Sequence, residues 1–127
     1  MALAWLFEDE SEPHAEFVLG ALPGNRILVP GHWFLEVANA LLTAERRGRI
    51  EPADVQRAIA LLEGLPIDVD ARTSQASMRD VLAIAARHRL TSYDAAYLEL
   101  CMREALPLAT LDRDLLAAST AVGVAIL

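Results

Sequence analysis

The stretch PLATLDRDLLAAS, residues 107–119, carries the pattern from which the fold prediction starts. A short apolar run at residues 107–111 is typical of a buried strand, and Asp112 follows it directly. Residues 113–119, which include the apolar pair Leu115 and Leu116, then predict a short helix. A strand followed by a helix is half of a βαβ unit, so this stretch favours a parallel sheet.

The same alternation extends over the rest of the chain. Strands are also predicted at residues 26–29, 67–69 and 122–127, and helices at residues 2–7, 13–22, 31–47, 52–63, 74–88 and 91–105. Short apolar strands between amphipathic helices predict one α/β domain, residues 1–127, built as a three-layer α/β/α sandwich around a short, mainly parallel sheet. Ligands of such sheets gather at the carboxyl ends of the strands.

Two of these helices have an apolar face that we expect to be buried. The spacing of three or four residues that defines such a face is followed in one by Phe34, Val37, Ala38, Leu41 and Leu42, and in the other by Met78, Val81, Leu82 and Ala85.

Composition excludes several classes of protein. The chain has 127 residues, 54% of them apolar, and one cysteine, which rules out an intrachain disulfide and a cysteine-rich zinc site. No apolar run reaches the roughly 18 residues of a membrane helix, and the start resembles no secretory signal. We therefore expect a protein of the cytoplasm with no membrane association.

Charge is unevenly distributed along the chain. The net charge is −7, which argues against generic binding of nucleic acid by a basic surface. Residues 8–16 alone contribute −5, whereas residues 17–127 hold 13 acids against 11 arginines. Two arginine groups stand out: Arg46, Arg47 and Arg49, and then Arg87 and Arg89 on either side of His88. Either they complement the dipoles at helix C-termini, or they contact phosphate.

Glu36 is the first candidate site residue. It falls early in the helix at residues 31–47, and Asn39 and Thr43 extend it into one polar stripe. The stripe either faces water, with Glu36 favoured by the positive end of the helix, or contributes to a site.

Asp94 is the second candidate. It opens the apolar stripe Tyr97, Leu98 and Cys101, whereas Glu99, Arg103 and Glu104 are expected on a solvated face. An acid on an apolar stripe needs compensation, which a metal could supply. The competing explanation is a capping box in Thr91-Ser92-Tyr93-Asp94.

Asp112 is the third candidate, with Asp114 close by. Asp112 could be simply the N-cap of the last helix. If the three acids converge instead, their mutual repulsion calls for a divalent cation, and hard oxygen ligands suit Mg²⁺ or Mn²⁺. Such a cation can activate water and stabilise displacement at a phosphate.

Other kinds of site are not indicated. The chain has no phosphate-binding glycine motif. His14, His32 and His88 lack metal-ligand spacing, and we expect them at the surface or its boundary. Cys101 is expected to be a buried thiol, since no base motif accompanies it.

Three segments together resemble the PIN domain family, and most closely its VapC-type toxins of type II toxin–antitoxin systems. They are LEVANAL (residues 35–41), SYDAAY (92–97) and ATLDRDL (109–115), and ALAWL (2–6) resembles the first helix of that family. The match is in order and spacing, and it runs over essentially the whole chain.

The resemblance implies a metal-dependent endoribonuclease that cleaves structured RNA, forms a homodimer and is neutralised by a cognate antitoxin. Glu36, Asp94 and Asp112 match the catalytic acids that bind Mg²⁺ or Mn²⁺, and Asp114 matches a possible fourth ligand. Thr110 matches a supporting hydroxyl residue, and Asn39 lies beside Glu36 in a supporting position.

One feature of the family is missing. PIN domains begin with a strand that ends in a further acid, and this chain begins within the following helix. We expect a late start or truncation, or else a degenerate copy that only binds an antitoxin or RNA, and weaker metal binding in either case. An α/β phosphatase or transferase that uses the same acids is a third alternative.

Overall fold

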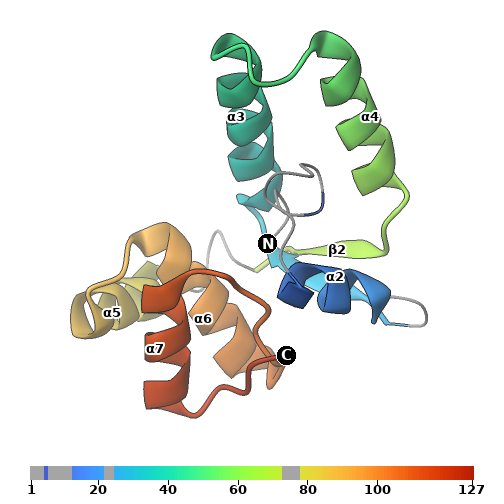
Figure 1. The fold of residues 1–127 in the computed structure, drawn as a ribbon. Coiled ribbons are helices and arrows are strands. Elements are labelled where there is room, and N and C mark those ends of the chain that lie inside the picture. Colours follow the sequence, from blue (N-terminus) through green and yellow to red (C-terminus); the bar gives the residue numbers. More distant parts are fainter. Residues whose placement is uncertain (1–4, 6–12, 22–24, 73–77) are drawn as a thin grey trace. The chain divides into compact units, whose positions relative to one another are not determined.

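The computed structural model describes residues 5, 13–21, 25–72 and 78–127 (Figure 1). This part of the chain forms helices and two short strands. In order they are α2 (Pro13–Gly20), β1 (Ile27–Pro30), α3 (Trp33–Arg46), α4 (Pro52–Glu63), β2 (Ile67–Asp70), α5 (Met78–His88), α6 (Ser92–Glu104) and α7 (Arg113–Val122). Strands β1 and β2 pair in parallel, which confirms a mixed α/β fold with a short parallel sheet.

The chain divides into two compact units. The carboxyl-terminal unit consists of Leu28–Gly31 and Asp68–Leu127, and it includes α5, α6 and α7. The amino-terminal unit consists of the described residues up to Ile27 together with His32–Ile67, and it includes α2, α3 and α4.

The carboxyl-terminal unit is built around α6. Helix α5 packs on α6 through Val81, Ala95 and Ala96, since the two small alanines allow the helices to approach closely. Helix α7 packs on α6 through a second cluster, whose buried members are Leu98, Cys101, Leu108, Leu115 and Ala118. Figure 1 shows α5, α6 and α7 gathered as one group. Helix α6 is thereby fixed by both neighbours.

The amino-terminal unit contains the α3–α4 hairpin. Helix α3 buries one line of residues at helical spacing: Trp33, Val37, Leu41 and Ala44. Helix α4 begins with Pro52 in its first turn, where the missing N–H is of no consequence, and Asp54 accepts a hydrogen bond from the backbone N–H of Glu51 (2.8 Å). In the same unit the indole N–H of Trp5 donates to the carbonyl of Ala15 (2.8 Å).

Several predicted elements differ from the structure. The predicted helix at residues 2–7 lies outside the described residues except for Trp5, as do residues 74–77 of the predicted helix at 74–88. The helix predicted to end at residue 119 continues to Val122, and Gly123 ends it in a left-handed conformation (φ +78°). A break at Thr120 was wrong because its hydroxyl bonds to the carbonyl of Leu116 within the helix (3.0 Å).

The two carboxyl-terminal strands are reduced to one parallel bridge. Leu108 donates to Ala125 (2.8 Å) and accepts from Leu127 (3.0 Å). Pro107 has no N–H to extend the ladder, and α7 takes the first residue of the predicted last strand. The strands predicted at residues 107–111 and 122–127 are therefore wrong in length, although their pairing is real.

The predicted apolar faces are only partly buried. Val37, Leu41 and Val81 are buried and Ala85 is half-buried, but the neighbouring stripe is exposed at Phe34, Ala38, Leu42, Met78 and Leu82. Successive stripes on a helix are about 100° apart, so that only one of them can face a single packing partner squarely.

Candidate active site

Asp94 lies in the first turn of α6, and Thr91 precedes it as the N-cap. The Thr91 hydroxyl accepts a hydrogen bond from the backbone N–H of Asp94 (3.1 Å) and lies 2.6 Å from Asp94 Oδ2, to which it donates. The N-cap half of the expected capping box is thus present, whereas the carboxylate of Asp94 bonds to the hydroxyl of Thr91. Oδ1 of Asp94 has no partner among the described residues. Asp94 is half-buried, and the carboxylate is held in one position by its own helix cap.

Asp112 is the N-cap of α7 and is exposed. Its Oδ1 accepts from the backbone N–H of Leu115 (2.8 Å), as the capping explanation predicts. The buried hydroxyl of Thr110 accepts from the backbone N–H of Asp112 (3.1 Å), which fixes the backbone immediately before the acid. Within the described chain, Oδ2 of Asp112 has no partner. Asp114 is exposed in the first turn of the same helix.

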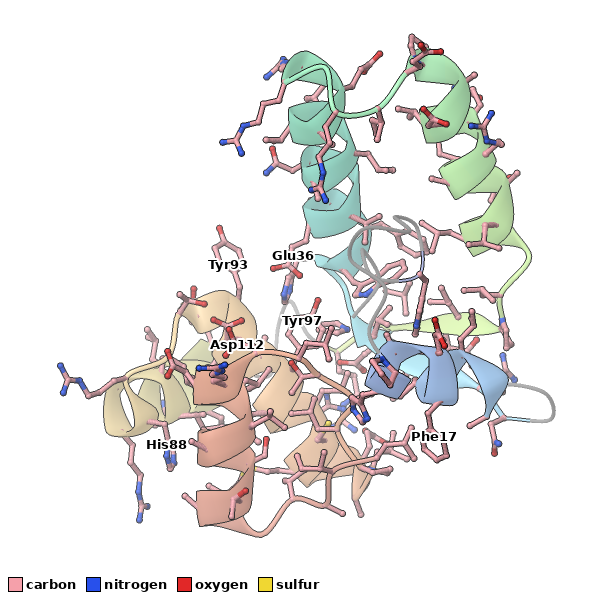
Figure 2. All side chains as sticks on the ribbon, viewed as in Figure 1. Phe17, Glu36, His88, Tyr93, Tyr97 and Asp112 are labelled. Carbon is pink, nitrogen blue, oxygen red and sulfur yellow. The ribbon has the colours of Figure 1, made fainter. Side chains whose placement is uncertain are left out.

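The two aspartates belong to one packed pair of helices. Leu98 of α6 and Leu115 of α7 meet in the same buried cluster, each within four residues of its acid. Figure 2 shows Tyr93, the neighbour of Asp94, and Asp112 toward the same end of these helices. The carboxyl-terminal unit therefore presents two acids from two helix N-termini.

Glu36 lies in the amino-terminal unit, in the first turn of α3. Its Oε2 is 3.6 Å from His32 Nε2, one turn earlier, and the side chain is 40% exposed. His32 is the N-cap of α3, but its side chain makes no cap hydrogen bond. Asn39 is exposed, and its backbone carbonyl accepts a hydrogen bond from the hydroxyl of Thr43 (2.7 Å).

The donors suit a divalent cation in kind. Carboxylate oxygens are the ligands that Mg²⁺ prefers, and Asp94 and Asp112 each keep one oxygen without a partner in the described chain. No group of three or more histidine, cysteine, aspartate or glutamate side chains that could hold a metal ion occurs among the described residues. The carboxyl-terminal unit therefore offers a pair of acids, and the assignment of Glu36 and Asp114 as further ligands stays a prediction.

The structure contains a buried ion cluster that the sequence did not predict. Glu99 was expected on a solvated face, but its side chain is only 9% exposed and binds Arg103 (2.9 Å). Arg103 also binds Asp70, at the end of β2 (2.7 Å), and Glu104 (2.5 Å). The hydrogen bond to Glu99 is the main cause that raises the pKa of Arg103 further above its usual range. The i, i+4 spacing of Glu99 and Arg103 could have indicated their ion pair. Nothing in the sequence indicates the bond of Arg103 to Asp70, 33 residues away.

The remaining candidate residues lie where simple considerations place them. His14, His32 and His88 are half-buried, as expected for boundary residues. Cys101 is buried, and burial raises the pKa of its thiol to about 11, which makes it a poor nucleophile.

Both arginine groups are at helix C-termini. Arg46 ends α3 and Arg47 is its C-cap, while Arg87 and His88 end α5. The expectation that these cations complement helix dipoles is consistent with the structure.

Comparison with known proteins identifies the family. A family model described as PIN domain matches residues 2–120, which is nearly the whole chain. The chain belongs to the PIN domain family. This family consists in general of nucleases, which typically depend on metal ions.

A solved structure supports the same assignment. The crystal structure of PAE2754 from Pyrobaculum aerophilum is similar to this PIN domain with a TM-score of 0.60 and 30% sequence identity. The likeness covers 72% of this chain and 60% of that chain. No curated protein matches the sequence. Within the described residues, no helix of this PIN domain is both long and apolar enough to span a bilayer.

Proposed function

We propose that this PIN domain protein is a Mg²⁺- or Mn²⁺-dependent endoribonuclease toxin of the VapC type, neutralised by a cognate antitoxin. The observation that supports the proposal most strongly is the pair of acids in the carboxyl-terminal unit. Asp94 and Asp112 begin two helices that pack together, and backbone or hydroxyl groups hold each carboxylate. Membership of the family supports nuclease activity in general, and this pair indicates which residues would carry it.

Each residue has a distinct part in this proposal. Asp94 and Asp112 would hold the cation, with Glu36 and Asp114 as the further ligands. Thr110 keeps Asp112 in position through its backbone N–H, and Asn39 supports Glu36. The cation, when bound, supplies an activated water and stabilises charge on the phosphate. The cation also offsets the repulsion that an RNA phosphate would meet near several acids.

The test is cleavage of total RNA in the presence of Mn²⁺. Asp112→Asn and Asp94→Asn remove one negative charge each but keep an acceptor oxygen. Asparagine caps a helix about as well as aspartate at position 112, and at position 94 its amide oxygen can still accept from the hydroxyl of Thr91. We expect each variant to lose activity by about 100-fold or more while its thermal midpoint stays unchanged, since a metal-bound water and charge stabilisation are lost together.

Asp80→Asn is the matched control. Asp80 is an exposed acid in the first turn of α5, in the same unit, so the variant makes the same chemical change at the same kind of helical position. It is expected to cleave like the unmodified protein. Cleavage at the unmodified rate by both Asp94→Asn and Asp112→Asn would overturn the proposal.

An alternative is a PIN module that binds RNA or an antitoxin without cleaving RNA. The observation that favours it is that the described residues include no group of three potential metal ligands. It predicts RNA binding without Mn²⁺-dependent products, and binding that survives Asp94→Asn.

The partners can be tested separately. We propose a homodimer that works in the cytoplasm and whose activity the antitoxin suppresses. Light scattering of the purified chain tests the dimer. The antitoxin is tested by co-expression of neighbouring small reading frames, one of which should form a stable complex and abolish RNA cleavage.

A further inference from the structure

The end of α5 and the residue that follows it carry two arginines and a histidine that the proposed catalytic chemistry does not use. We define the arginine corner as Arg87, His88 and Arg89. Arg87 and Arg89 are exposed, and His88, which is labelled in Figure 2, is half-buried. We propose that the arginine corner, together with Tyr93, binds the backbone and a base of an unpaired RNA strand; this inference rests on the proposed function.

The charge around the corner favours a polyanion. Neither Arg87 nor Arg89 forms an ion pair with any described residue, in contrast to Arg57 and Arg103, which bind acids. Residues 81–93 contain no acid at all, in a chain whose net charge is −7. The corner is therefore a local positive site, and a guanidinium group presents the paired donors that match a phosphate.

The helix dipole explains only part of this group. Cations are favoured in the last turn of a helix, which accounts for Arg87. Arg89 follows the helix with φ of +58°, a conformation that glycine adopts most easily. Gly48 and Gly123 take it in this chain, while Ala105 shows that a side chain is tolerated. Arginine at position 89 keeps an exposed cation where glycine would be the relaxed choice.

The corner leads directly to the candidate acids. Arg89 precedes Asp94 by five residues, and the N-cap Thr91 lies between them. The corner, Asp94 and Asp112 all belong to the carboxyl-terminal unit. A phosphate bound at the corner would thus be held by residues that precede Asp94 closely in the sequence.

Tyr93, four residues after Arg89, adds an exposed aromatic ring in the same unit. It stands next to Asp94 in the first turn of α6, and it is 59% exposed. Exposed aromatic rings stack on unpaired bases with little regard to sequence, and duplex RNA offers no such free base. The combination of arginines and an exposed ring therefore points to single-stranded RNA.

The other arginine group is a weaker candidate. Arg46 and Arg47 lie at the end of α3 opposite to Glu36, about 15 Å along the helix at 1.5 Å per residue. Two acids, Glu45 and Glu51, flank that group in sequence. It therefore serves as the matched control for the corner.

The test measures binding of a short, unstructured, fluorescent RNA by anisotropy, with EDTA present so that no cleavage occurs. Arg87→Gln/Arg89→Gln should bind roughly tenfold more weakly. The slope of log K against log salt concentration, measured between about 50 and 200 mM, should become less steep by about 1.4. Tyr93→Ala should weaken binding about fivefold or more with the salt dependence unchanged. Arg46→Gln/Arg47→Gln should bind like the unmodified protein, and a duplex of the same sequence should bind more weakly than the single strand.

The outcomes separate this proposal from the proposed function. If the protein cleaves and binds RNA but Arg87→Gln/Arg89→Gln leaves affinity and salt dependence unchanged, the arginine corner is wrong and the nuclease stands. The same conclusion follows if Arg46→Gln/Arg47→Gln is the variant that weakens binding. If the unmodified protein neither binds nor cleaves RNA, both proposals are overturned. Loss of binding confined to the corner and Tyr93 supports the inference.

Discussion

The acids of the two units are held in different ways. In the carboxyl-terminal unit, the carboxylates of Asp94 and Asp112 are fixed by short hydrogen bonds at the caps of α6 and α7. In the amino-terminal unit, Glu36 is a longer side chain on an exposed face, with His32 at 3.6 Å. A metal site gains most from ligands that are already positioned, and Asp94 and Asp112 meet that condition.

The ion pairs of the two units also differ, because those of Arg103 are largely buried and the one of Arg57 is exposed. Arg103, 16% exposed, lies among Glu99, Asp70 and Glu104 in the carboxyl-terminal unit. Arg57 pairs with Asp54 on the surface of α4, and its side chain is 72% exposed. A buried pair is costly to break, because the remaining charges lose their partner, whereas an exposed pair contributes little.

The largest effect is expected from Arg103. Arg103→Leu leaves the buried carboxylates of Asp70 and Glu99 without their counter-charge, so it should lower the free energy of unfolding of the carboxyl-terminal unit by about 3 kcal/mol. Hydrogen exchange of the backbone amides in α6 measures this loss for the carboxyl-terminal unit alone. Arg57→Leu is the matched control and should change the exchange of α4 by no more than about 0.5 kcal/mol. Equal effects of the two variants would show that the units do not differ in this way.

A smaller effect is expected from Thr110. Thr110→Val keeps the shape of a buried side chain but removes the oxygen that accepts from the N–H of Asp112, so we expect a loss of about 1 kcal/mol in thermal unfolding. Because the acid is then less well positioned, RNA cleavage should also fall. Thr43→Val removes a hydroxyl that bonds within α3, and it should have almost no effect on either measurement. A fall in cleavage with Thr43→Val but not with Thr110→Val would reverse the comparison.

The smallest effect concerns Cys101. Burial raises the pKa of the thiol from 9.0 to about 11, so the folded state favours the neutral form. The resulting stability is present below about pH 9 and is lost as the pH rises toward 11. At about pH 8 we expect iodoacetamide to react much more slowly with the folded protein than with the protein in denaturant. Equally fast alkylation in both states would show that α6 and α7 do not bury this residue.

Local patterns in the sequence were sufficient for most of the fold. The helix at Pro52–Glu63 was predicted at its exact bounds because Pro52 opens it and Gly64 follows it. Caps at Thr91 and Asp112 were among the alternatives that residue type and position alone had indicated, and the structure shows both. Such signals act within one turn of helix, so a single sequence contains them in full.

Features that depend on distant residues were not predictable in this way. Glu99 has the charge and spacing of a solvated residue, but it is buried against Arg103, which also binds Asp70 from 33 residues away. The strand at residues 107–111 has a suitable composition, but pairing needs a partner, and Ile126 provides a single bridge. The candidate site shows the same limit: the local setting of Asp94 and Asp112 was foreseen, while the convergence of Glu36 with them is still a prediction.

Direct binding of Mn²⁺ tests the central claim, which is that Asp94 and Asp112 are ligands of one divalent cation. We expect calorimetric titration to show one Mn²⁺ bound per chain, with affinity lowered at least tenfold in both Asp94→Asn and Asp112→Asn and unchanged in Asp80→Asn. Mn²⁺ binding of equal strength in all four proteins, or weakened only by Asp80→Asn, would contradict the account.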